Sequence, residues 1–284
     1  MSVSPPGTST APHHRPRLIW AIRRGAGDFY DRLGLMVLGS AVMMLFPAVA
    51  VMAAGALRPV AGPAAAAVVM FLLGWYGLVC GWGVNILLAH RIAYFLDPGA
   101  DAFRDFARTF LWPALKLGTV QLVLTVVMLA DAAFFLSRSS LLLKMAGMLM
   151  AYLLLLWLMM QLWQWPFLVT EEGGVWKAVR KSALLLLDNP FFTLGAFSVT
   201  MTAGALLLLS GIGAVVALGG LGACFIVRAH RELLMKYGVV EDEPEVIEDT
   251  GWPSSNEPPR RLNPREYVGN PGGGDDPGAQ HPPG

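Results

Sequence analysis

Six apolar segments of about 20 residues constrain what this chain can fold into more than any other feature. A helix of that length crosses the hydrocarbon core of a bilayer, which is about 30 Å thick. The chain is 55% hydrophobic and 14% charged, whereas soluble proteins contain roughly 25% charged residues. We therefore expect an all-α fold, a polytopic transmembrane helical bundle. Its predicted spans are residues 34–54, 65–88, 114–136, 141–163, 190–209 and 211–228.

The last two segments are the least clearly separated. Ser210-Gly211-Ile212-Gly213 is a poor turn between them. Residues 190–228 therefore form either two spans or one long kinked helix followed by a re-entrant piece.

The ends of the chain differ in composition from its centre. Residues 1–16 are rich in Pro, Ser and Thr, and residues 238–284 begin with an acidic run and continue rich in Pro and Gly. Neither end can bury enough apolar surface to order itself, so both are predicted to be disordered. They flank an integral membrane domain at residues 17–237.

Positive charge predicts the orientation, because loops rich in Lys and Arg stay in the cytoplasm. With six spans and a cytoplasmic N-terminus, the loops on the outer side hold only Arg58, Arg138 and Lys144. The remaining basic residues near the spans then lie inside. With five spans the separation is weaker, so both termini are predicted to be cytoplasmic.

The end of the fourth segment and the helix that follows it predict contacts with lipid headgroups. Trp163 and Trp165 end the segment, and indole side chains prefer a membrane interface. Lys177, Arg180 and Lys181 share one face of an amphipathic helix, which is typical of a helix lying in the membrane plane. These five residues are predicted interfacial anchors.

The two long cytoplasmic loops resemble each other and indicate an internal repeat. Each has turn residues, an amphipathic helix, a proline and a glycine five residues later; the prolines are Pro113 and Pro190. Ala89-His90-Arg91 after the second segment also recurs as Ala229-His230-Arg231 after the sixth. We expect three repeated helical hairpins with interfacial cytoplasmic helices.

Polar side chains inside apolar segments are costly and are therefore candidates for function. Asp131 is either a proton or cation site, or a carboxylate that pairs with Arg138 or Lys144 or reaches headgroup water. The amides either line a polar cavity or form hydrogen bonds between helices, which are worth about 1 kcal/mol each. These candidate positions are Asn85, Gln121, Asp131, Gln161 and Gln164.

Other motifs point to packing rather than chemistry. Gly77 and Gly81 form a GxxxG pair that permits close helix contact, which we expect within one monomer. Cys80 and Cys224 lie in apolar segments without a CxxC partner, so we expect neither a disulfide nor a metal pair. No catalytic, cofactor-binding or metal-ligating set emerges, and the net charge of +1 gives no indication of nucleic acid binding.

A set of short motifs, in this order and spacing, resembles the YesL-like family of bacterial polytopic membrane proteins, a domain of unknown function. The resemblance covers roughly residues 20–237, with two departures: Gly39-Ser40-Ala41 stands where the family has an Asn-rich first span, and Trp163 stands where it has Tyr. The motifs are Asp28-Phe29-Tyr30, Pro47, the spaced Phe103, Phe106 and Phe110, Gln161-Leu162-Trp163, Trp165-Pro166-Phe167-Leu168, Lys181-Ser182-Ala183 and Asn189-Pro190.

Members of this family are often encoded beside sugar-uptake transporters, so the resemblance implies a connection to carbohydrate import and a sugar-uptake transporter complex as partner. We expect a non-enzymatic, accessory or regulatory component in the bacterial cytoplasmic membrane. The alternatives are a small stand-alone transporter and a membrane-embedded enzyme on a lipid-linked substrate. The sequence leaves the oligomeric state open.

Overall fold

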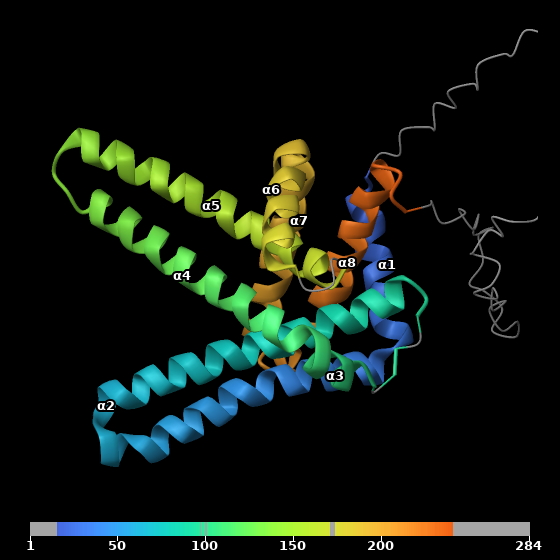
Figure 1. The fold of residues 1–284 in the computed structure, drawn as a ribbon, viewed down its shortest axis with the longest axis horizontal. Helices are drawn as coiled ribbons and strands as arrows, with labels where there is room; N and C mark the ends of the chain where they lie inside the picture. The colour runs from blue at the N-terminus through green and yellow to red at the C-terminus, as the bar shows by residue number, and fades with distance from the viewer. Residues whose placement is uncertain (1–15, 97, 100, 171–173, 241–284) are drawn as a thin grey trace, which may run out of the picture. The chain divides into compact units, whose positions relative to one another are not determined.

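The computed structural model describes residues 16–96, 98–99, 101–170 and 174–240, and every regular element within these ranges is a helix (Figure 1). The all-α prediction is therefore confirmed. Most of the two predicted disordered ends, residues 1–15 and 241–284, lies outside the described part. The helices are α1 (Leu18–Asp31), α2 (Leu33–Ala93), α3 (Asp101–Asp105), α4 (Leu111–Leu136), α5 (Leu141–Thr170), α6 (Val175–Asp188), α7 (Pro190–Leu209) and α8 (Gly219–Lys236).

Two π-helical turns adjoin these helices. The turn η1 (Phe106–Phe110) joins α3 to α4, and η2 (Ala214–Leu218) precedes α8. Five of the helical stretches in the described part are long and apolar enough to cross a membrane. They contain α2, α4, α5, α7 and α8.

The helix α2 reverses its direction at Gly62. Its 61 residues would extend about 90 Å as a straight helix, but Gly62 has φ 84° and ψ 169°. Glycine adopts a positive φ without a steric penalty, and Pro59 and Pro63 cannot donate the backbone hydrogen bonds that would continue the helix. The reversal falls in the gap predicted between the first two apolar segments.

The two halves of α2 pack against each other along small residues (Figure 1). A Cβ at Gly77 would lie 2.2 Å from Cβ of Phe46, and one at Gly81 would lie 2.6 Å from Cα of Met43. The residue numbers of these contacts are nearly symmetric about residue 62, as in an antiparallel hairpin. The prediction that Gly77 and Gly81 mediate a contact within the chain is confirmed.

The helices α4 and α5 form a second antiparallel pair (Figure 1). Ser137 caps the end of α4, and α5 begins four residues later at Leu141. Gly147 allows the start of α5 to approach the end of α4, because a Cβ there would lie 2.8 Å from Cγ of Leu136. Aliphatic side chains are exposed along most of this pair.

The helix α7 is separate from the segment that follows it. The chain turns at Gly211, which has φ 65°, and Ser210 Oγ accepts a hydrogen bond from the Gly213 amide at 2.9 Å. The next helical segment returns beside α7, where a Cβ at Gly204 would lie 3.8 Å from a methyl carbon of Leu218. Residues 190–228 therefore form two helices rather than one kinked helix.

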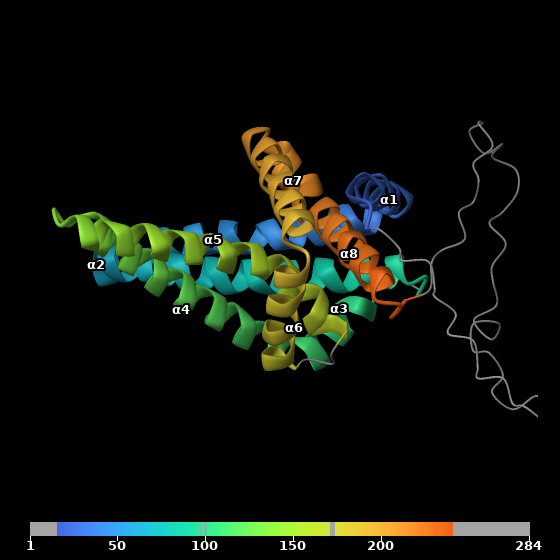
Figure 2. The same ribbon diagram turned by 90° about the horizontal axis from the view of Figure 1, so that it is seen from above.

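The helix α8 has the most buried surroundings of the long helices. All of its residues from Ala223 to Leu233 are buried, and α1 and α2 pack against it (Figure 1, Figure 2). A Cβ at Gly25 of α1 would lie 2.9 Å from Cα of Phe225, so glycine lets the two backbones nearly touch. Residues from Arg228 to the end of α8 contact α1, α2 and α6 and form part of the candidate site.

Candidate functional site

Charged side chains are buried at the end of α8. Arg228 is 3% exposed and Glu232 is 2% exposed, and a buried charge is stable only when it is paired and hydrogen-bonded. Arg228 binds Asp28 of α1 with two donors, and the bond from its Nη2 to Asp28 Oδ1 is 2.8 Å long. Glu232 accepts a hydrogen bond from the backbone amide of Arg17 at 3.2 Å. This end of α8 therefore holds α1 in place.

Arg231 connects α8 to the end of α2. Its Nη1 donates to the carbonyl oxygen of Ala93 at 2.7 Å, and its guanidinium lies 5.4 Å from the centre of the Tyr94 ring. A carbonyl at a helix end lacks an intrahelical partner, so a cation is favourable there. Sequence reasoning missed both this contact and the Asp28–Arg228 pair, although the repeated Ala-His-Arg triplet marked the region.

The buried amides predicted inside the spans form hydrogen bonds between helices. Gln121 Nε2 donates to Gln164 Oε1 at 2.8 Å, joining α4 to α5. Thr125 of α4 accepts from Gln161 at 3.1 Å. Asn85 Nδ2 donates to the carbonyl of Gly39, which joins the two halves of α2. Of the two alternatives for these amides, the structure supports interhelical bonding.

Two polar atoms in this group have no hydrogen-bond partner among the described residues: Asn85 Oδ1 and Gln164 Nε2. Asn85 lies among small residues, and a Cβ at Gly39 would approach its Oδ1 to 2.5 Å. The Asn85 side chain lies so close to the Gly39 backbone that only glycine fits at position 39.

Asp131 stands apart from the other candidate positions. It is half-buried on α4 and makes no hydrogen bond or ion pair with the described residues. The alternative of a pairing with Arg138 or Lys144 is not found among the described residues, and Arg138 stacks over the ring of Phe134 at 4.2 Å. Asp131 is thus separated from the other polar groups.

Two of the predicted interfacial anchors are interior residues. Trp163 is fully buried and Trp165 is 6% exposed, which removes both indoles from contact with lipid headgroups. Trp163 Nε1 donates to Thr193 of α7 at 3.1 Å, so a buried partner satisfies its polar group. The prediction for these two residues is wrong, because both indoles are buried, and for Trp163 a hydrogen bond inside the protein replaces the one expected at the interface.

The three basic anchors lie where the amphipathic pattern placed them. Lys177, Arg180 and Lys181 are exposed on α6, while Ala178 and Ser182 of the same helix are buried. Trp176 is 79% exposed beside them. This face of α6 combines cations with an exposed indole, as membrane-surface helices do.

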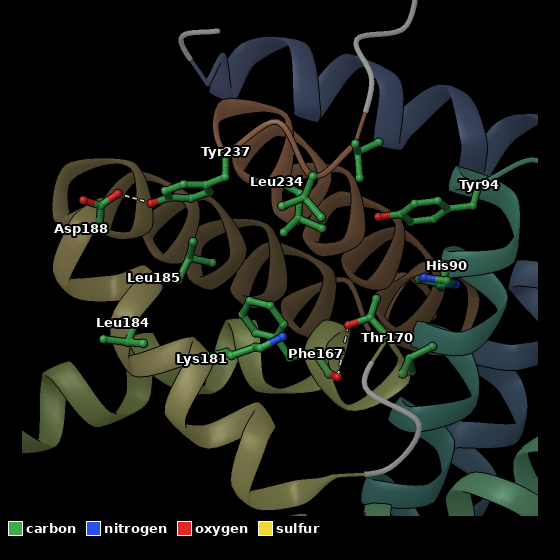
Figure 3. A pocket seen from close by; sticks show the side chains of 13 residues that line it. His90, Tyr94, Phe167, Thr170, Lys181, Leu184, Leu185, Asp188, Leu234 and Tyr237 are labelled. Atoms are coloured by element: carbon green, nitrogen blue, oxygen red, sulfur yellow. Dashed lines mark hydrogen bonds between the residues drawn. The ribbon is translucent and has the colours of Figure 1, made fainter. Parts of the chain in front are cut away.

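A cavity of about 820 Å³ lies between the ends of α2, α5, α6 and α8 (Figure 3). Its walls are mainly apolar. From α2 it receives His90 and Tyr94, and from α6 it receives Lys181, which points from that helix towards Phe167 of α5 (Figure 3). The other lining residues are Val169, Thr170, Leu184, Leu185, Asp188, Leu234, Tyr237, Val239 and Val240.

A hydrogen-bonded cluster closes one side of this cavity. Asp188 accepts hydrogen bonds from the Tyr237 hydroxyl and from Lys236 Nζ, the latter at 3.0 Å. Asn189 accepts from the same Lys236 at 2.7 Å. These bonds hold the pKa of Asp188 below its ordinary value, and burial raises the pKa of Tyr237. The cluster joins α6 to the end of α8.

A second imidazole lies behind the cavity wall. His230 is 1% exposed, and its ring meets the ring of Phe167 edge-on at 4.5 Å between centres. Its Nε2 has no hydrogen-bond partner among the described residues. The His90 ring stacks on Tyr94 at 4.4 Å. The repeated triplet therefore places both of its histidines near one end of the helices.

The described residues contain no group of three or more His, Cys, Asp or Glu side chains that could hold a metal ion. Cys80 and Cys224 are free thiols. Cys224 instead approaches the sulfur of Met36 at 3.9 Å. Comparisons of the chain with protein-family models, curated proteins and solved structures gave no match.

Proposed function

We propose that the chain is an integral protein of the bacterial cytoplasmic membrane, with six spans and both termini in the cytoplasm. Two of these spans are the halves of α2 on either side of Gly62. The proposal is supported by the five long apolar helical stretches and by the aliphatic side chains exposed on them. It also accords with the concentration of basic residues in the loops assigned to one side.

This topology is tested by labelling single cysteines in intact cells, after Cys80 and Cys224 have been replaced. A cysteine at Ser139, between α4 and α5, should react with an impermeant reagent. A cysteine at Ser255 should react only after the cells are opened. The reverse result at either position would contradict the orientation.

The proposed activity is that of an accessory or regulatory component of a solute-uptake system, with carbohydrate as the solute class that the YesL resemblance implies. One observation carries this proposal: the amides of α4 and α5 form hydrogen bonds between these two helices. Such bonds stabilise a helical scaffold. A scaffold with exposed apolar helices suits association with another membrane component.

Purification of the native protein in a gentle detergent, with mass spectrometry of what remains bound, tests this activity. A transporter subunit in stoichiometric amount is the expected result, and it would also identify the solute to examine. Recovery of the protein without any partner, in two different mild detergents, would contradict the accessory role.

A stand-alone transporter is the second candidate, and the cavity between α2, α5, α6 and α8 favours it, because its volume suits a small solute. Uptake of labelled sugar by proteoliposomes that contain this protein alone would support it. The Asp131→Asn variant then shows whether that carboxylate takes part. Unchanged uptake would remove Asp131 from the mechanism.

A further inference from the structure

The polar groups around the cavity fall into two sets. Asp188 and Tyr237 bond to each other and to Lys236 and Asn189, so the first set is satisfied within the protein. The second set comprises His90 and Tyr94 of α2, and Lys181 of α6 places a cation in the same lining. Neither the His90 ring nor the Tyr94 hydroxyl makes a hydrogen bond with a described residue. Hydrogen-bonding capacity therefore remains available on the α2 wall.

The Tyr94 hydroxyl is held in a fixed position. Its ring is stacked on His90 on one side and lies 5.4 Å from the guanidinium of Arg231. In Figure 3 the hydroxyl points away from α2, towards Leu234 of α8. A rigid aromatic ring with an available hydroxyl is a suitable donor for a ligand oxygen.

The remaining walls favour an apolar ligand segment. Phe167, Leu184, Leu185 and Leu234 line the cavity from α5, α6 and α8. A volume of about 820 Å³ lies in the range of about 300–1,000 Å³ for sites that take drug-sized ligands. The cavity is therefore far larger than a small inorganic anion requires. A ligand that matches both kinds of wall has an apolar part and a polar head.

We propose that this cavity binds an anionic, phosphate-bearing amphiphile, with its acyl part against Phe167, Leu184, Leu185 and Leu234 and its phosphate beside Lys181, His90 and Tyr94. The lysine supplies a point charge, and the imidazole and phenol supply hydrogen bonds to phosphate oxygens. A lysine near a membrane surface attracts anionic lipid headgroups, and the one carboxylate among the described residues of the lining, Asp188, is already bonded to Lys236 and Tyr237. The proposal goes beyond the accessory role and does not depend on any uptake partner.

The test uses the full-length protein in detergent, titrated with dioctanoyl phosphatidylglycerol and followed by native mass spectrometry and by the shift in Tm. Dioctanoyl phosphatidylcholine and inorganic phosphate serve as the comparison probes. We expect one phosphatidylglycerol molecule per chain, bound more tightly than the other two. Equal binding of the zwitterionic lipid would overturn the anionic preference. Inorganic phosphate that binds as tightly as the lipid would overturn the claim that the ligand needs an apolar part.

Three variants examine the polar end of the site. Lys181→Gln should weaken phosphatidylglycerol binding about five-fold, whereas Lys177→Gln, on the same helix but outside the cavity lining, should leave it unchanged. Tyr94→Phe removes a hydroxyl that makes no hydrogen bond with a described residue, so folding should be preserved. It should weaken binding about three- to ten-fold. Equal effects of the two lysine variants would overturn the placement of the phosphate.

One matched pair examines the apolar end. Both leucines are exposed on α6, but only Leu184 lines the cavity, whereas Leu187 does not. We expect Leu184→Trp to fill the cavity and abolish binding of one lipid per chain, and Leu187→Trp to leave it intact. Normal binding by Leu184→Trp would show that the lipid lies elsewhere and would overturn the proposal.

Discussion

The pair α4–α5 and the helix α8 differ in how their apolarity relates to their burial. The more apolar helix α5 is mostly exposed, whereas the less apolar helix α8 is mostly buried. In the most apolar 18 residues of α5, 6% of the residues are buried. In the most apolar 18 residues of the stretch Ala214–Lys236, which contains α8, 67% are buried. Yet that stretch is the least apolar of the five. The exposed side chains of α5 include Leu141, Leu142, Met145, Met148 and Leu149.

This difference shows how apolarity relates to burial in such a chain. Lipid is as apolar as leucine, so a leucine-rich helix gains little by leaving it for the protein interior. A helix with charges and small residues gains more, because other helices supply ion pairs, hydrogen bonds and close backbone contact. The buried ionic end of α8 is therefore expected to contribute more to stability than any equal length of α4 or α5.

The largest expected effect comes from breaking the ion pair of α1 and α8. Asp28→Asn leaves Arg228 as a buried charge without its carboxylate, so we expect a loss of about 3–5 kcal/mol in the free energy of unfolding. Unfolding of the detergent-solubilised protein measures it. Asp131→Asn is the matched control and should change stability by less than about 0.5 kcal/mol. Similar losses in both variants would remove the distinction between the two regions.

Replacing both members of the pair sharpens this test. An Asp28→Leu and Arg228→Met double variant has no unpaired buried charge, and apolar replacements of buried ion pairs are often neutral. We expect it to be more stable than Asp28→Asn alone. A double variant as unstable as the single one would show that lost packing, rather than lost charge pairing, explains the effect.

Close backbone contact within α2 should give an intermediate effect. In Gly81→Ala the new Cβ would lie 2.6 Å from Cα of Met43, and such overpacking costs about 1–3 kcal/mol. Gly55→Ala is the control, since nothing lies within 4 Å of a Cβ there. Thermal unfolding of the two variants measures the difference. Equal Tm values would contradict the tight contact between the two halves.

The hydrogen bond between α4 and α5 should contribute less. Gln121→Leu removes the donor to Gln164, and bonds between membrane helices are worth about 0.6–2 kcal/mol. A double-mutant cycle with Gln164→Leu isolates the pairwise energy from the loss of each side chain. A coupling energy near zero would show that this hydrogen bond does not stabilise the pair, which would leave packing and the bonds to Thr125.

The smallest expected effect concerns pH. The pKa of Asp188 is lowered in the folded protein, so its contribution to stability is present above its unfolded value of about 3.9 and is lost as pH falls through the folded pKa. Unfolding measured at pH 7 and at pH 3 should show a smaller acid-induced loss in Asp188→Asn than in the unmodified protein. An equal loss of stability in the two proteins would show that the Asp188 cluster does not contribute to acid unfolding.

The apolar segments were predictable because each long helix must be apolar over its whole length, and the reversal of α2 falls in the predicted gap. The interior position of Trp163 was not predictable. An indole near the end of an apolar segment satisfies its N–H equally well at headgroups or at a buried Thr193, and only tertiary structure decides between them. Arg228 was missed for a related reason, because its partner Asp28 is 200 residues away.

That separation has a consequence for biosynthesis. The halves of α2 meet across a single local turn, so their pairing involves little loop-closure entropy and requires no later part of the chain. Asp28, in contrast, cannot meet its partner until residue 228 has been translated. The Asp28 carboxylate of α1 therefore lacks Arg228 while α2 to α7 are being synthesised. This contact forms only with α8, the last helix of the described residues.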